Sequence, residues 1–93
     1  MGILFEWDSN KAIMNVAKHA ISFEEATTVF GDELSITIES KVKRVTERRF
    51  VTIGSSVKNR ILVVVHTARG QKIRIISSRM ASKNERKQYF NEK

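Results

Sequence analysis

Apolar residues recur first at helical spacing and later at every second position, and this change divides the chain into two parts. Residues 3–7 predict a short first strand, and Asp8 is suited to cap a following helix. The apolar residues of that helix lie three or four positions apart: Ala12, Ile13, Val16, Ala17 and Ala20. We expect this side of the helix to face the core, with Lys11, Asn15 and Lys18 on the opposite side.

A second helix is expected to begin at Ser22. Ser22 and Glu25 have the spacing of a capping box, in which each side chain bonds the backbone N–H of the other residue. The apolar residues of this helix are Phe23, Ala26, Val29 and Phe30. Gly31 is expected to end it.

From Leu34 onward, apolar and polar residues alternate, which is the pattern of half-buried strands. The predicted strands cover residues 34–38, 49–55, 61–67 and 71–78, with an exposed loop or long hairpin turn at 39–48. A last helix is expected to begin at Ser82, again with a capping box, to Glu85. The predicted fold is therefore α+β, with a mostly antiparallel sheet in the order β-α-α-β-β-β-β-α, as one domain over residues 1–93.

The turn of the last hairpin decides which side chains share a face. If Gly70 closes a three-residue loop in a left-handed conformation, a bulge follows and the strand register is determined. The predicted pairs are Thr67 with Gln71, His66 with Lys72, and Val64 with Arg74. This register places His66, Lys72 and Arg74 on a polar face, opposite Ile61, Val63, Val65, Ile73 and Ile75. A two-residue turn of Arg69 and Gly70 would instead pair His66 with Ile73 and mix the two faces.

Composition narrows the class of protein. The chain of 93 residues contains no Cys and only two His, which excludes disulfides and makes a structural zinc site unfavourable. The longest apolar run, Ile61 to Val65, is too short to span a bilayer, and no signal peptide is recognisable. We expect a cytoplasmic protein. Phosphate-loop, dinucleotide, zinc-protease and serine-hydrolase motifs are also missing from the sequence.

Charge is divided unevenly along the chain, whose net charge is +7. Residues 1–40 carry two Lys against seven acidic residues, a net charge of −5, whereas residues 41–93 carry fifteen Lys or Arg against three acidic residues, a net charge of +12. A basic half of this kind is the expected electrostatic signature of a nucleic-acid site. A basic face that meets an acidic protein partner remains an alternative.

Metal-free RNA cleavage by the 2′-hydroxyl needs a base, an acid and cations that stabilise charge on the phosphate. His66 has a side chain suited to proton transfer, and Arg74 and Lys72 can hold a phosphate. Arg79, just beyond the strand, can make a second phosphate contact, and Tyr89 can stack on a base or assist proton transfer. Simpler structural roles stay open for each of these residues: a solvated sheet face for the charged residues, an exposed strand position for His66, and anchoring of the last helix for Tyr89.

Several motifs together resemble the BrnT family of toxins. They are Phe5-Glu6-Trp7-Asp8, Lys18-His19, Ser22-Phe23-Glu24-Glu25-Ala26, Val29-Phe30, Arg49 to Gly54, Leu62 to Thr67, Ile73 to Ser77, and Arg79 to Tyr89. The resemblance extends over nearly the whole chain. One departure is Met80, which stands where the family often has a cation.

The resemblance implies a RelE-like fold and an endoribonuclease that blocks translation. No cofactor is expected for the cleavage of RNA. It also implies a cognate BrnA-like antitoxin that masks the toxin and binds operator DNA with it. The expected catalytic residues are His66, Arg74, Arg79 and Tyr89. The expected RNA contacts are Arg49, Lys72, Lys18, His19, Lys83 and Arg86. A non-catalytic nucleic-acid-binding module and a basic interaction protein are the competing hypotheses.

Overall fold

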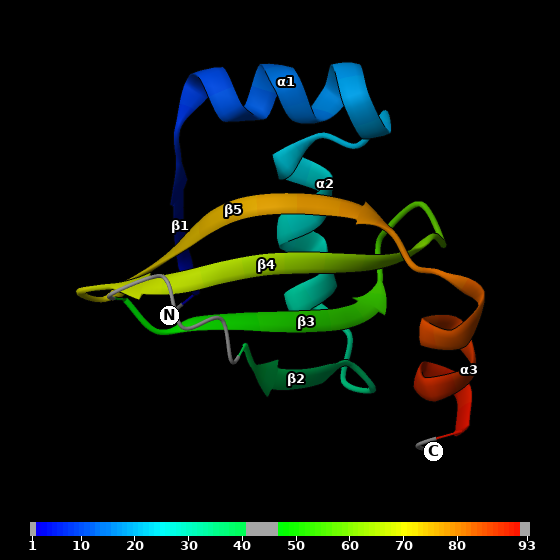
Figure 1. The fold of residues 1–93 in the computed structure, drawn as a ribbon. Helices are drawn as coiled ribbons and strands as arrows, with labels where there is room; N and C mark the ends of the chain where they lie inside the picture. Colours follow the sequence, from blue (N-terminus) through cyan, green and yellow to red (C-terminus); the bar gives the residue numbers. More distant parts are fainter. Residues whose placement is uncertain (1, 41–46, 92–93) are drawn as a thin grey trace.

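In the computed structural model, which describes residues 2–40 and 47–91, the helices and strands follow the predicted order (Figure 1). The elements are β1 (Leu4–Trp7), α1 (Ser9–His19), α2 (Phe23–Thr28), a 3-10 turn η1 (Val29–Gly31), β2 (Ile36–Glu39), β3 (Arg49–Ser55), β4 (Ile61–Arg69), β5 (Lys72–Met80) and α3 (Lys83–Asn91). The second predicted helix thus changes to 3-10 geometry for its last turn. Most of the predicted 39–48 loop lies outside the described residues.

The strands form one mixed sheet in the order β1-β5-β4-β3-β2. The pairs β2–β3, β3–β4 and β4–β5 are antiparallel, as the alternating pattern predicted. The first strand is different because it pairs in parallel with β5. The first and last strands of the chain, β1 and β5, are therefore neighbours in the sheet. Helices α1 and α2 and the turn η1 connect β1 to β2, which lies at the opposite edge.

The two faces of the sheet are covered unequally. On one, here called the covered face, α2 and η1 pack their apolar side chains against Leu62, Val64 and Ile75 of the central strands. On the other, here called the open face, α3 covers one end by packing Tyr89 against Ile53, Ile61 and Val63. Figure 1 shows α2 crossing the strands and α3 at one end of the sheet. The rest of the open face therefore lies free of helices in the described part of the chain.

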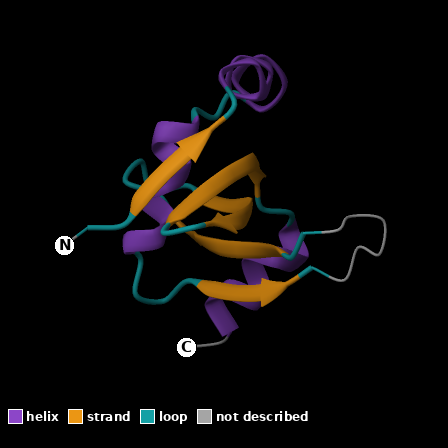
Figure 2. Cartoon of the chain, turned by 90° about the vertical axis from the view of Figure 1, so that its left-hand side faces the viewer, coloured by secondary structure: helices purple, strands orange, loops and turns teal. Residues whose placement is uncertain are grey.

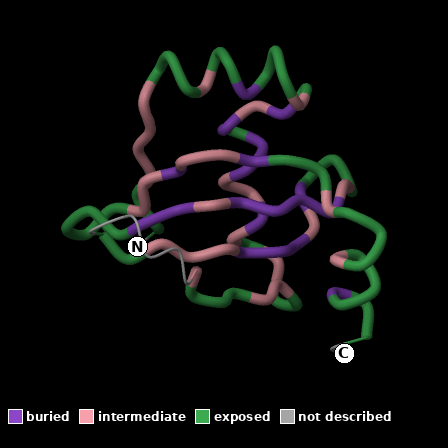
Figure 3. Tube along the Cα trace, in the orientation of Figure 1, coloured by how far each residue is buried: buried purple, intermediate pink, exposed green. Residues whose placement is uncertain are grey.

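Helix α1 lies beyond the edge of the sheet, alongside β5, rather than over a face (Figures 1 and 2). The side it buries is not the predicted one: Asn15 is buried, whereas Ile13 is 69% and Val16 49% exposed. The Asn15 amide donates to the carbonyl of Ser78 at 2.8 Å and accepts from the Ser78 N–H at 3.1 Å. It thus pairs with β5 as a neighbouring strand would, beyond the point where β1 ends. Figure 3 shows the resulting exposure of most of α1.

All three predicted helix caps are present, but only one of the two predicted capping boxes is reciprocal. Asp8 Oδ2 accepts from the Lys11 N–H at 3.0 Å at the start of α1. Ser82 Oγ accepts from the Glu85 N–H, and the Glu85 carboxylate accepts from the Ser82 N–H, as predicted. Ser22 Oγ also accepts from the Glu25 N–H, at 3.0 Å. The Glu25 carboxylate, however, is buried and binds Arg60 and Ser56 instead of returning to Ser22, so the predicted reciprocity there is wrong.

The predicted register of the last hairpin is wrong. The turn has two residues, Gly70 and Gln71, because Arg69 pairs with Lys72. Gly70 adopts a φ of 61°, which a type II′ turn requires at its first position. The register shifts farther along the hairpin, where His66 pairs with Ile75 but Val65 with Ser77, so that Ile76 is the extra residue. Arg74 therefore lies opposite Thr67, on the other face from His66.

Candidate nucleic-acid interface

Four side chains form a row across the open face. The strand register aligns Glu6 of β1 with Arg74 of β5, Arg74 with Thr67 of β4, and Thr67 with Arg49 of β3. Neighbouring strands lie about 4.8 Å apart, so the two arginine backbones are about 10 Å apart. Guanidinium groups on side chains of this length can reach a single phosphate placed between them.

A carboxylate orients each arginine of this row. Arg74 Nη1 donates to Glu6 at 2.8 Å, and Arg49 Nε donates to Glu47 at 3.3 Å. The hydrogen bond from Arg74 lowers the pKa of Glu6. Both arginine side chains are 30% exposed, and Nε and Nη2 of Arg74 have no hydrogen-bond partner among the described residues. The arginines are thus held in place while N–H donors remain available to an anion.

Further cations extend this surface at both ends. At the hairpin tip, Lys72 pairs with Arg69, a cation that the sequence prediction did not include. At the other end, Arg79 binds Glu85 through two hydrogen bonds of 2.8 Å, which lower the pKa of Glu85 to about 2. Arg79 is therefore engaged with the first turn of α3 more fully than Arg74 is with Glu6. Lys83 and Arg86 are exposed on α3 itself.

His66 does not join the arginines, which corrects the prediction that His66, Lys72 and Arg74 share a face. It lies on the covered face, is 7% exposed, and is hydrogen-bonded to Thr52 at 2.8 Å. The rings of Phe30 and Phe50 lie 4.8 and 5.9 Å from it. This burial lowers its pKa to about 4, so His66 is a neutral, enclosed group at neutral pH.

Tyr89 has the structural role that the sequence left open, rather than a role in base stacking. Its side chain is 3% exposed in the cluster beneath α3, and its hydroxyl donates to Asp32 at 2.6 Å. Burial and the neighbouring carboxylate raise its pKa to about 12. Tyr89 therefore anchors α3 to the sheet and is not accessible to a nucleobase.

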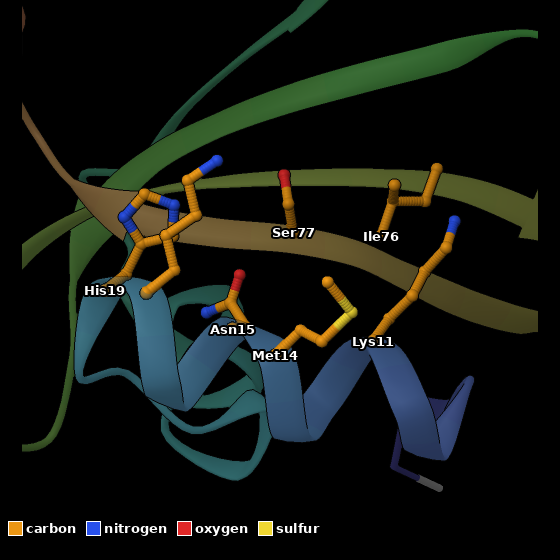
Figure 4. A pocket seen from close by; sticks show the side chains of 7 residues that line it. Lys11, Met14, Asn15, His19, Ile76 and Ser77 are labelled. Carbon is orange, nitrogen blue, oxygen red and sulfur yellow. The ribbon is translucent and has the colours of Figure 1, made fainter.

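A groove of about 290 Å³ lies between α1 and β5. It is lined by Lys11, Met14, Asn15, Lys18, His19, Ile76 and Ser77. Figure 4 shows Lys11 and His19 extending from α1 toward β5, with Ser77 and Ile76 between them on the strand. The structure thus brings together Lys18 and His19, both predicted contacts, and adds Lys11 and Ser77, which were not among the predicted contacts.

The groove adjoins the open face through Ser77. This residue pairs with Val65, which is two positions along β4 from Val63 and therefore on the same, open face. Ser77 also lines the groove, so it borders both surfaces. The bulge at Ile76 occurs at the same place. Bulges often mark sites where a strand redirects a side chain toward a ligand. The row of arginines and the groove therefore form adjacent parts of one candidate interface.

Other kinds of site have little support in residues 2–40 and 47–91. There, no group of three or more His, Asp or Glu side chains is arranged to hold a metal ion. None of the described helices is both long and apolar enough to cross a membrane.

Two of the comparisons with known proteins give a match. The model of a family described as the ribonuclease toxin BrnT of type II toxin-antitoxin systems matches residues 7–85. The fold is similar to the 1.1 Å crystal structure of the Brucella abortus ribonuclease toxin BrnT, with a TM-score of 0.69 and 24% sequence identity over 88% of this chain and 100% of that one. No curated protein sequence matches the chain.

Proposed function

Because this chain belongs to the BrnT family of ribonuclease toxins of type II toxin-antitoxin systems, we propose that it is a cytoplasmic endoribonuclease that blocks translation by cleaving RNA on its open face. The observation that carries this proposal is the row formed by Glu6, Arg74, Thr67 and Arg49. It offers two oriented guanidinium groups to a phosphodiester. Lys72 and the groove residues Lys18 and His19 extend the contact along the RNA, as do Lys83 and Arg86 where the strand approaches α3.

The proposed reaction is attack of the 2′-hydroxyl on the adjacent phosphate. Charge builds up on the phosphate oxygens in the transition state, and Arg74 and Arg49 stabilise it through charge-assisted hydrogen bonds. Arg79 gives weaker support because Glu85 already occupies two of its N–H groups. The reaction proceeds without a metal ion, since the arginines supply the positive charge.

The test is cleavage of a defined RNA by the purified protein in the presence of a metal chelator. We expect products that end in a 2′,3′-cyclic phosphate and a 5′-hydroxyl, because these are the ends that 2′-hydroxyl attack leaves. Products with a 5′-phosphate, or activity that disappears with the chelator, would contradict the mechanism. Binding of RNA without cleavage would instead identify a nucleic-acid-binding module.

A type II system pairs the toxin with an antitoxin, and we propose a BrnA-like partner that covers the open face with acidic side chains. The open face carries several cations, among them Arg69, Lys72 and Arg74, so a protein that covers it is expected to present a complementary negative charge. Raising the salt concentration should therefore weaken the toxin–antitoxin complex, as measured by calorimetry at two ionic strengths. Equal affinity at both would show that an apolar contact dominates. The two proteins together are expected to form a hetero-oligomer that binds operator DNA.

A further inference from the structure

Among the described residues, the carboxylates of the open face are all bound to arginines, whereas the groove beside it contains an imidazole. On that face, Glu6, Glu47 and Glu85 are each bound to an arginine, so each carboxylate already has a cationic partner. The arginines also lower the pKa of Glu6 and Glu85, which makes these two weaker bases. His66 is enclosed on the opposite face. The base for cleavage must therefore come from a neighbouring surface, and the groove between α1 and β5 is the one that borders the open face through Ser77.

The residues that line the groove differ in what they can do with a proton. Lys11 and Lys18 have ammonium groups, which donate hydrogen bonds and accept none. The Asn15 amide is buried, with its oxygen and nitrogen bound to β5. Serine hydroxyls such as that of Ser77 are weak bases. His19 is the remaining polar side chain of the lining, and its imidazole has a lone pair of useful basicity.

Helix α1 holds His19 in this position. The paired hydrogen bonds between Asn15 and Ser78 fix the helix against β5 one turn before His19. The helix ends there, because Ala20 adopts the left-handed conformation with a φ of 58°. His19 is half-buried, so it is accessible to a ligand in the groove while its range of motion is limited.

We propose that His19 is the general base of the ribonuclease, and that the scissile phosphate lies between the groove and the open face. This inference rests on the proposed RNA cleavage. The imidazole takes the proton of the 2′-hydroxyl as the 2′-oxygen forms its bond to phosphorus and the bond to the 5′-oxygen breaks. The leaving 5′-oxygen receives a proton from solvent. Lys11 and Lys18 contact the phosphate from the groove, while the arginines of the open face stabilise its charge from the other side. This arrangement places the adjacent 2′-hydroxyl next to His19.

The charged groups near His19 come from α1 and from the turn before β4. Lys11 and Lys18 face it from α1, and β5 contributes only the uncharged Ile76 and Ser77 to the groove. Arg60 donates to the carbonyl of Ala20 next to it, but its guanidinium also binds Glu25. A general base acts in its neutral form, so the cleavage rate should rise with pH, and the rise should depend on His19.

The test compares single-turnover cleavage by the wild-type protein and His19→Gln over pH 5 to 8. We expect the substitution to lower the rate by about 10²–10⁴-fold, the usual contribution of a general base, and to remove the pH-dependent rise. Affinity for a 2′-O-methyl RNA, which cannot be cleaved, should fall far less than the cleavage rate, because His19 is one of several RNA contacts. Gln retains a polar side chain at this half-buried position, so folding should be preserved.

Two outcomes would overturn the assignment. Wild-type rate and pH profile in His19→Gln would show that His19 is not the base. A wild-type rate that falls as pH rises through this range, with the fall lost in His19→Gln, would identify His19 as the acid instead. Neither outcome affects the proposed function, which fails only if the wild-type protein does not cleave RNA.

Discussion

At the scale of single residues, the two histidines show how environment decides the chemistry of a side chain. His66 is enclosed between two phenylalanine rings and bonded to Thr52, so its protonated form is disfavoured. His19 lies half-buried in a groove lined by lysines. The sequence shows two imidazoles without indicating which one is accessible. The prediction that His66 transfers protons did not take its burial into account. This burial is produced by residues of neighbouring elements, such as Phe30 and Phe50.

The low pKa of His66 predicts that the protein loses stability as the solution becomes mildly acidic. In the unfolded chain an ordinary histidine binds a proton near pH 6.5, whereas the pKa of folded His66 is about 4. The contribution of neutral His66 to the free energy of unfolding is complete above pH 6.5 and is lost as the pH falls toward 4. Between pH 7.5 and 5.5 the free energy of unfolding should fall by about 1 kcal/mol, measured by urea denaturation.

The control for this prediction is the His19→Gln background, in which His66 is the remaining histidine of the two. Ordinary carboxylates titrate below the chosen interval, so the loss of stability there reports His66. An unfolding free energy that stays constant from pH 7.5 to 5.5 in this background would show that folded His66 takes up a proton as easily as the unfolded chain does.

At the scale of elements, the sequence predicted the strands, the helices and all three helix caps, because each depends on residues close together in the chain. It did not predict the register of the last hairpin, because Gly70 suits either a two-residue or a three-residue turn. It also assigned the wrong side of α1 to the core. The buried side is defined by Asn15, whose partner Ser78 is 63 positions away along the chain. A local hydrophobic pattern contains no information about such a partner.

The contact between η1 and β3 predicts a difference between two glycines. A Cβ atom on Gly54 of β3 would lie 2.8 Å from Val29 Cγ1 and 2.9 Å from Ser35 Cβ, whereas one on Gly31 of η1 would have no atom within 4 Å. Gly54→Ala should therefore lower the free energy of unfolding by about 1–3 kcal/mol, the usual cost of overpacking. Gly31→Ala should have a smaller effect. Equal stabilities of the two variants in chemical denaturation would mean that η1 does not pack closely on β3.

At the scale of the whole molecule, the uneven charge of the sequence predicted a basic surface but not its arrangement. The basic half supplies Arg49, Arg69, Lys72 and Arg74 to the open face. The acidic half is not excluded from it, since Glu6 of β1 binds Arg74. The parallel pairing of β1 with β5 produces this contact, and no sequence pattern predicted it. The fold thus combines the two halves into arginines that are oriented by carboxylates.

The central claim is that RNA is cleaved on the open face, and a matched pair of substitutions tests it most directly. Arg74→Ala removes a cation from the row on that face, and Lys58→Ala removes one exposed cation from the turn between β3 and β4. The measurement is the single-turnover RNA cleavage rate of both variants, after denaturation has shown that both are folded. We expect Arg74→Ala to be slower by on the order of 10²–10³-fold, and Lys58→Ala to cleave at a rate close to wild type. A folded Arg74→Ala protein that cleaves as fast as Lys58→Ala would contradict the claim.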